Sequence, residues 1–132
     1  MENTTTAAGS NTAELTDTSV GREFYDRHVQ FLVDRDTDRL IDEHYNENAT
    51  LISHDGVVRG REDLKQHFKG YLEMLGDLEV LSTDKFTDTG DSILFEATVN
   101  SHLGQARVYD AFVLRDLKID YHFTGVMSGG ST

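Results

Sequence analysis

The spacing of apolar residues predicts helices in the first part of the chain. Between Gly21 and Asp34, apolar and aromatic residues recur at the i, i+3, i+4, i+7 spacing of one helix face, and charged residues occupy the other. After the break at 34–36, Thr37 is expected to cap a short second helix that turns Leu40, Ile41 and Tyr45 inward. A third helix is expected from Gly60 to Gly76, because glycine is the usual C-terminal cap.

Alternation of apolar and polar residues predicts strands in the rest of the chain. Expected are a strand at 49–53, a turn at 54–56 and a short partner at 57–59, then four strands near 78–85, 92–102, 105–114 and 117–127. Helices first and a strand meander last indicate an α+β fold. The predicted architecture is a cone-shaped α+β barrel, with three N-terminal helices packed on a strongly curved antiparallel sheet. Its concave side tends to leave a pocket.

The length of 132 residues fits a single domain. We expect this domain over 21–127, with a flexible tail over 1–20 and a frayed end over 128–132. No apolar run approaches the roughly 20 residues that span a bilayer, and the first residues do not resemble a secretion signal. A cytoplasmic protein without membrane contact is therefore expected.

Composition and charge exclude several classes of function. Cysteine is absent, which excludes disulfides, thiolate nucleophiles and cysteine-ligated zinc. The formal charge of −12 repels nucleic-acid phosphates and anionic lipids. No pair of histidines has metal-binding spacing, and the only glycine pair lies in the C-terminal tail. We therefore expect neither a metal, a bound cofactor nor a nucleic-acid partner.

Two stretches carry a resemblance to a known family. The segment YNENATLISHDGVVRGREDLKQHFKGYLEML (45–75) resembles the nuclear transport factor 2-like superfamily. The preceding HVQFLVDRDTDRLIDEHY (28–45) resembles the first two helices of ketosteroid isomerase and of SnoaL-like polyketide cyclases. The expected order of elements agrees with these proteins over 21–127. The fold hosts enzymes of several kinds and also binding proteins without catalytic activity.

The resemblance implies roles for individual residues. Asp110 matches the oxyanion-hole aspartic acid of ketosteroid isomerase, and His28 matches its oxyanion-hole tyrosine. Ser53 stands where those enzymes have their catalytic base, which is a departure from the family pattern. In SnoaL-like cyclases the acid/base residue is an acidic residue of the late strands, for which Asp110 and Asp120 are the candidates here. The resemblance also implies a homodimer formed through the outer face of the sheet.

Strand pleating tests these assignments independently, because residues two apart share a face. Asp110 then lies with Val108 and Phe112, whose apolar surfaces favour the neutral carboxylic acid that can donate a hydrogen bond or shuttle a proton. Asp120, His122 and Thr124 are expected on one face of the last strand, and Ile119, Tyr121 and Phe123 on the other. His122 could pair with Asp110, either as a base of fixed tautomer or as a merely satisfied buried pair.

Other candidates have a structural interpretation beside the functional one. His28 and Tyr25 lie on the apolar stripe of the first helix, and could donate hydrogen bonds into a pocket or simply pack. Phe68 and Phe112 are candidate pocket walls, whereas His67 and Tyr71 are expected to pack. Ser53, His54 and Asp55 cannot form a triad, because consecutive strand residues point in alternate directions. Ser53 and His54 remain candidates for the rim of a substrate pocket.

Two functions are open at this point. One is a cofactor-independent isomerase or cyclase that encloses an apolar carbonyl compound, with Asp110, His122 and His28 as catalytic residues. Its substrate-binding residues would be Tyr25, Ser53, His54, Phe68, Phe112, Asp120 and Thr124. The other is a non-catalytic ligand-binding or scaffold homodimer, which Ser53 in place of a carboxylate favours.

Overall fold

The computed structural model describes residues 19–129 and has an α+β fold, as predicted. Most of the expected N-terminal tail and frayed C-terminus lies outside this range. The elements of the described residues are α1 (Val20–Val33), α2 (Thr37–His44), β1 (Tyr45–Ser53), β2 (Gly56–Arg59), α3 (Arg61–Leu75), β3 (Glu79–Asp88), β4 (Ser92–Ser101), β5 (Gly104–Arg115) and β6 (Lys118–Gly129).

The strands form one sheet in the order β2-β1-β6-β5-β4-β3. The expectation of a wholly antiparallel sheet is wrong, because β1 runs parallel to β6 while the other neighbouring strands are antiparallel. Local alternation specifies a strand but not the direction in which a distant strand meets it. The parallel pair joins the N-terminal hairpin to the C-terminal meander.

The helix ends follow from local chemistry, with two differences from expectation. The side chain of Ser19 accepts a hydrogen bond from the backbone nitrogen of Arg22 and caps α1. Asp36, and not Thr37, caps α2 by accepting from the nitrogen of Arg39. Tyr45 begins β1 instead of completing α2, since it pairs with Ile119 of β6. The last helix begins after Gly60 and ends at Gly76, as expected.

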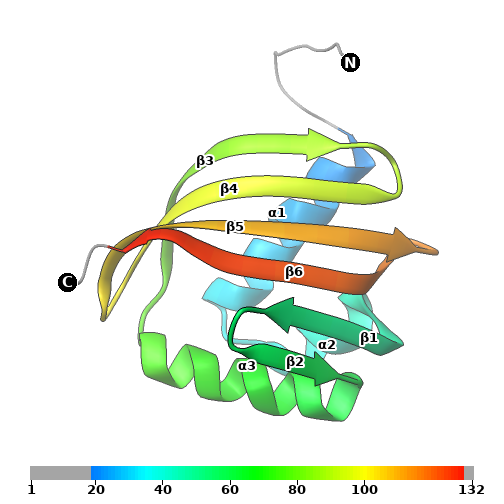
Figure 1. The fold of residues 1–132 in the computed structure, drawn as a ribbon, viewed down its shortest axis with the longest axis horizontal. Coiled ribbons are helices and arrows are strands. Elements are labelled where there is room, and N and C mark those ends of the chain that lie inside the picture. The colour runs from blue at the N-terminus through cyan, green and yellow to red at the C-terminus, as the bar shows by residue number, and fades with distance from the viewer. Residues whose placement is uncertain (1–18, 130–132) are drawn as a thin grey trace.

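The hydrophobic core lies between the helices and one face of the sheet. Figure 1 shows α1 crossing behind the strands of the meander. Fully buried side chains from the helices and strands meet there, including Leu40, Ile41, Leu64, Phe112 and Ile119. This helix-covered side of the sheet is called its inner face below.

A β-bulge in β6 corrects the expected assignment of faces. Val113 pairs with Tyr121 and Leu114 pairs with Ile119, so Asp120 is an extra residue opposite β5. Ile119 is consequently buried in the core, although alternation placed it outside. Simple pleating placed Asp120 on the same face as His122, and this expectation is wrong. Asp120 instead forms an ion pair with Arg115 near the β5–β6 turn.

Candidate functional site

Three polar side chains form a hydrogen-bonded row through the inner face of the sheet. His122 Nε2 lies 2.6 Å from Asp110 Oδ1, and His122 Nδ1 lies 2.8 Å from the hydroxyl oxygen of Tyr45. Tyr45 is fully buried, while the side chains of His122 and Asp110 are 5% and 14% exposed. Asp110 is thus the end of the row that reaches solvent.

Different contacts hold each member of this row in position. Asp110 and His122 lie on adjacent strands, held by the β5–β6 register. Tyr45 begins β1, where the guanidinium of Arg61 donates to its backbone oxygen from Nε at 3.0 Å and from Nη2 at 2.8 Å. Phe112 packs edge-on against His122, with ring centroids 4.7 Å apart. The histidine ring is therefore fixed from both ends and from one side.

The donor and acceptor chemistry of the row is consistent with one arrangement of protons when Asp110 is ionised. Asp110 then accepts from Nε2–H of a neutral His122, and Nδ1 of that ring accepts from the hydroxyl of Tyr45. Within the described chain, Oδ2 of Asp110 makes no hydrogen bond. The row therefore presents one free carboxylate oxygen backed by an oriented imidazole, an arrangement that can take up and return a proton.

Residues of α3 and β6 lie beside the row. Thr124 is the direct cross-strand partner of Asp110, and the buried Phe68 of α3 lies against His122, with ring centroids 6.5 Å apart. His67 and Tyr71, expected only to pack, are partly covered, with Tyr71 39% exposed, and their rings stack with an interplanar angle of 7°.

The pKa values of the groups around the row depend on burial and on the ionisation of Asp110 and His122. Burial first, and then the negative charge of Asp110, raise the pKa of Tyr45 well above its ordinary value and also raise that of Tyr71. Burial first, and then repulsion from His122 when that ring is protonated, lower the pKa of His67. Both tyrosines therefore stay protonated and can donate hydrogen bonds at neutral pH.

His28 lies deeper, in a second buried pair with His44. Their Nδ1 atoms are 3.4 Å apart, and the ring of His28 also meets that of His122 edge-on, with centroids 6.1 Å apart. Burial lowers the pKa of His28 well below its ordinary value, with further lowering from His122 and His44. Both rings are neutral at physiological pH, since burial likewise lowers the pKa of His44 to about 4.

Four expected site residues lie apart from this row. Tyr25 is buried, and its hydroxyl is 2.6 Å from the hydroxyl of Thr83. The Oγ atom of Ser53 accepts from the backbone nitrogen of Asp55 in the β1–β2 turn, where His54 is exposed. Asp120 accepts from Arg115 and Asn46. Of these four, Asp120 is excluded from the inner face by the β-bulge described above.

Tyr45 and His44 were missed by the sequence prediction. Tyr45 was assigned to a helix end as an inward-facing residue, without a role in the site. The available signal was its own polarity: a tyrosine buried at an inward position requires a partner for its hydroxyl. His44 was hidden by its position among the charged residues of 42–43.

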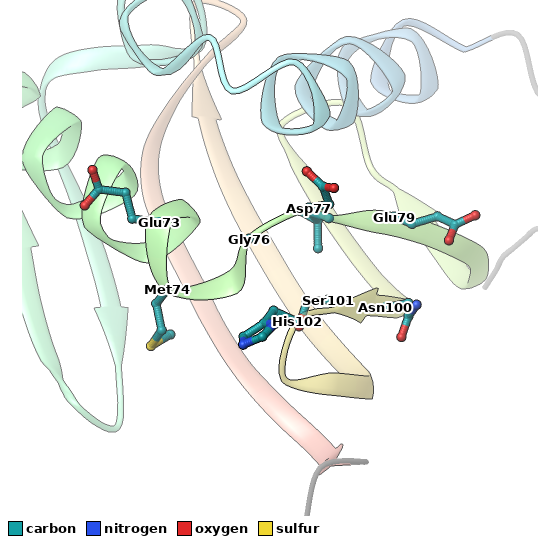
Figure 2. A pocket seen from close by; sticks show the side chains of 9 residues that line it. Glu73, Met74, Gly76, Asp77, Glu79, Asn100, Ser101 and His102 are labelled. Atoms are coloured by element: carbon teal, nitrogen blue, oxygen red, sulfur yellow. The ribbon is translucent and has the colours of Figure 1, made fainter.

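Two pockets of the described chain lie away from Asp110. One, of about 570 Å³, is lined by residues of the α3–β3 junction and the β4–β5 turn. Figure 2 shows that the carboxylates of Glu73, Asp77 and Glu79 around it point in different directions. The other, of about 450 Å³, lies beside His44. In the described residues, no group of three or more His, Cys, Asp or Glu side chains is arranged to hold a metal ion.

Comparison with solved structures shows the nuclear transport factor 2-like fold. A nuclear transport factor 2-like protein from Anabaena variabilis superposes with a TM-score of 0.73 at 22% identity, covering 90% of this chain and 98% of the other. A protein with a ketosteroid isomerase-like fold from Catenulispora acidiphila, solved in complex with trimethylamine, superposes with a TM-score of 0.69 at 16% identity, covering 78% and 84%.

A third similar structure is a provisionally assigned polyketide cyclase from Sinorhizobium meliloti, with a TM-score of 0.69 at 15% identity, covering 78% of this chain and 94% of that one. No protein-family model matches the sequence, and a search of curated proteins found no significant match. These similarities establish the fold. None of the helices in the described range has the length and apolar character needed to cross a membrane.

Proposed function

We propose that the protein is a cofactor-independent isomerase or cyclase of the SnoaL-like or ketosteroid isomerase-like branch, acting on an apolar carbonyl compound. The observation that carries the proposal is the row Asp110–His122–Tyr45, which holds a carboxylate with one free oxygen at the inner face of the sheet. The similar folds provisionally assigned as a cyclase or described as isomerase-like support the same reaction class. We expect a cytoplasmic protein.

The proposed reaction begins with transfer of a proton from the carbon next to the carbonyl to Oδ2 of Asp110. The C–H electron pair becomes the C=C bond of an enolate, and the carbonyl oxygen takes the negative charge. Tyr71 makes no hydrogen bond within the described chain and can donate one to that oxygen. Where a C=C bond of the substrate is conjugated with the enolate, return of the proton to the far carbon gives an isomer. Where the enolate carbon attacks a second carbonyl, a ring closes and the resulting alkoxide takes the proton from Asp110.

The remaining predicted residues have supporting roles in this proposal. His122, oriented by Tyr45, holds Asp110 in place, and His28 backs His122 from the core. Phe68, Phe112 and Thr124 shape the walls around the ligand, whereas Tyr25 is buried apart from the row and bonded to Thr83. Ser53 and His54 lie in the β1–β2 turn, where we expect them to contact only the rim of the substrate pocket.

A homodimer formed through the outer face of the sheet is also proposed. Tyr121 and Phe123 are 45% and 40% exposed there, and their rings stack on one another. Val113 lies opposite Tyr121, and Leu94 and Phe123 flank Ala111 on either side. Exposed aromatic and aliphatic side chains on adjacent strands form a patch of the kind that a partner copy covers.

The second candidate is a non-catalytic ligand-binding or scaffold dimer of the same fold. It is favoured by Ser53, which replaces the expected catalytic base and is held in the turn by its hydrogen bond to the nitrogen of Asp55. In that case the polar row would only satisfy its own hydrogen bonds, and no compound would be turned over.

A thermal-shift screen of polycyclic ketones, steroids and quinones tests the proposal. A ligand at a hundred times its Kd stabilises the native state by about 2.7 kcal/mol. We expect a hit whose stabilisation is lost in Asp110→Asn and kept in Asp120→Asn, the matched control outside the inner face. A hit that both variants retain equally would place the ligand elsewhere and remove the support for the proposed site.

A further inference from the structure

A separate apolar pocket lies beyond His28, away from Asp110. It has a volume of about 450 Å³ and is formed by the start of α1, the end of α2 and the turns β3–β4 and β5–β6. Figure 1 shows the start of α1 beside the β3–β4 turn. Its volume is within the range of small-molecule sites. His28 contacts both His44, which lines this pocket, and His122 of the polar row.

The wall of the pocket is aromatic and its rim is aliphatic. The rings of Phe24 and His44 stack with centroids 3.9 Å apart and an interplanar angle of 16°. Leu114 lies partly buried beside them. At the rim, Val20 and Leu117 are 64% and 62% exposed. A planar apolar molecule in the pocket would cover all of these surfaces.

The two-residue turn that carries Leu117 has the left-handed backbone geometry of a tight β-hairpin. Asp116 and Leu117 have φ values of 56° and 63°, in the left-handed region that favours glycine or asparagine. Leu117 is 62% exposed in this turn, so its side chain can contact a molecule held at the mouth of the pocket.

The polar groups define which molecule fits. The neutral imidazole of His44 uses Nδ1 toward His28, and its Nε2 makes no hydrogen bond within the described chain. Around the mouth, Arg27 is paired with Glu43, and Glu23 and Asp88 add negative charge. This mouth repels anions, whereas a neutral hydroxyl group can donate to or accept from Nε2 of His44.

We propose that this pocket is a binding site for a small neutral phenol, whose ring packs against the side of the Phe24–His44 stack and whose hydroxyl bonds to His44 Nε2. The site is distinct from the proposed catalytic row and does not depend on the function proposed there. Leu117 covers the bound ring from the β5–β6 turn.

The test is an NMR titration of the full-length protein with phenol and with toluene. Phenol is expected to shift the methyl signals of Leu114 and Leu117 saturably, and to bind at least about tenfold more tightly than toluene, the equivalent of 1.4 kcal/mol. His44→Phe keeps the aromatic stack but should abolish the preference for phenol. Leu117→Gly removes a side chain from the pocket lining, and glycine readily adopts the backbone conformation of the turn. We expect this variant to bind both phenol and toluene more weakly while its core stays intact.

Asp110→Asn is the control, because it alters the catalytic row alone and should leave phenol binding unchanged. The proposal is overturned where phenol fails to saturate any signal by about 10 mM, a weak-binding limit of roughly 2.7 kcal/mol. It is equally overturned where the shifts centre on residues around Asp110, or where His44→Phe folds and still prefers phenol.

Discussion

The Nε2 atom of His122 lies 2.6 Å from Oδ1 of Asp110, on the adjacent strand of the sheet. The other nitrogen of this histidine is held by the buried hydroxyl of Tyr45. A carboxylate, an imidazole and a phenol thus form one row, whose carboxylate end is the more exposed. The predictions below test this row, the deeper histidine pair and the outer face of the sheet.

Removal of the Tyr45 hydroxyl is expected to release His122. In Tyr45→Phe the Nδ1 atom loses its partner in a buried setting, so the free energy of unfolding should fall by about 1–3 kcal/mol. The side-chain ¹⁵N signals of His122 should also change, because its tautomer is no longer held. The control Tyr25→Phe removes another buried hydroxyl bond, that to Thr83, and should leave those signals in place. Unchanged His122 signals in Tyr45→Phe would contradict the row.

Stability should decrease in mild acid because of the deeper histidine pair. In the unfolded chain a histidine titrates near pH 6.5, whereas burial lowers the pKa of His44 to about 4 in the native state. Between these values the unfolded state binds more protons, so the free energy of unfolding falls as the pH falls. From pH 7 to pH 5 the loss should be about 2 kcal/mol for His44 alone, with a further loss from His28.

Urea unfolding at the two pH values measures this loss. The groups around His44 are Arg27 and Lys118, which lower its pKa further, and Glu43, which opposes them. His44→Phe should flatten the pH dependence, whereas His54→Gln in the exposed β1–β2 turn should leave it as in the wild type. Equal slopes for both variants would show that the pair stays charged or solvated in the native state.

The outer face of the sheet should hold two copies together. Sedimentation velocity at micromolar concentrations is expected to give a dimer for the wild type and a monomer for Phe123→Lys, because a lysine would be desolvated in the interface. Val33→Lys, at the exposed end of α1 on the helix side of the sheet, is the matched control and should remain dimeric. A wild-type monomer, or a dimer that survives Phe123→Lys, would contradict the proposed interface.

Much of the fold followed from the pattern of apolar residues, because long periodic segments specify their own element. The ends of α3 at Gly60 and Gly76 are examples, and so is the placement of Asp110 beside Phe112 on the inner face. These features depend on neighbours within one helix or strand. Local periodicity is sufficient for them.

Features that depend on distant strands could not be predicted in this way. The bulge at Asp120 moves Ile119 to the core, and a bulge is set by how two strands fit rather than by alternation within one. Tyr45 was assigned to a helix because its strand partner, Ile119, lies far along the chain. The role of Tyr45 in holding His122 became visible only when the sheet brought them together.

Hydrogen–deuterium exchange at the carbon next to a ketone is the most direct test of the central claim, that Asp110 transfers a proton. NMR in D₂O with β-tetralone and a panel of polycyclic ketones follows the exchange with wild type, Asp110→Asn and Asp120→Asn. We predict that the wild type and Asp120→Asn accelerate exchange of at least one ketone, and that Asp110→Asn lowers this acceleration by about 10²-fold or more. Exchange that is equally fast with Asp110→Asn, or no faster with the wild type than in buffer alone, would contradict the account.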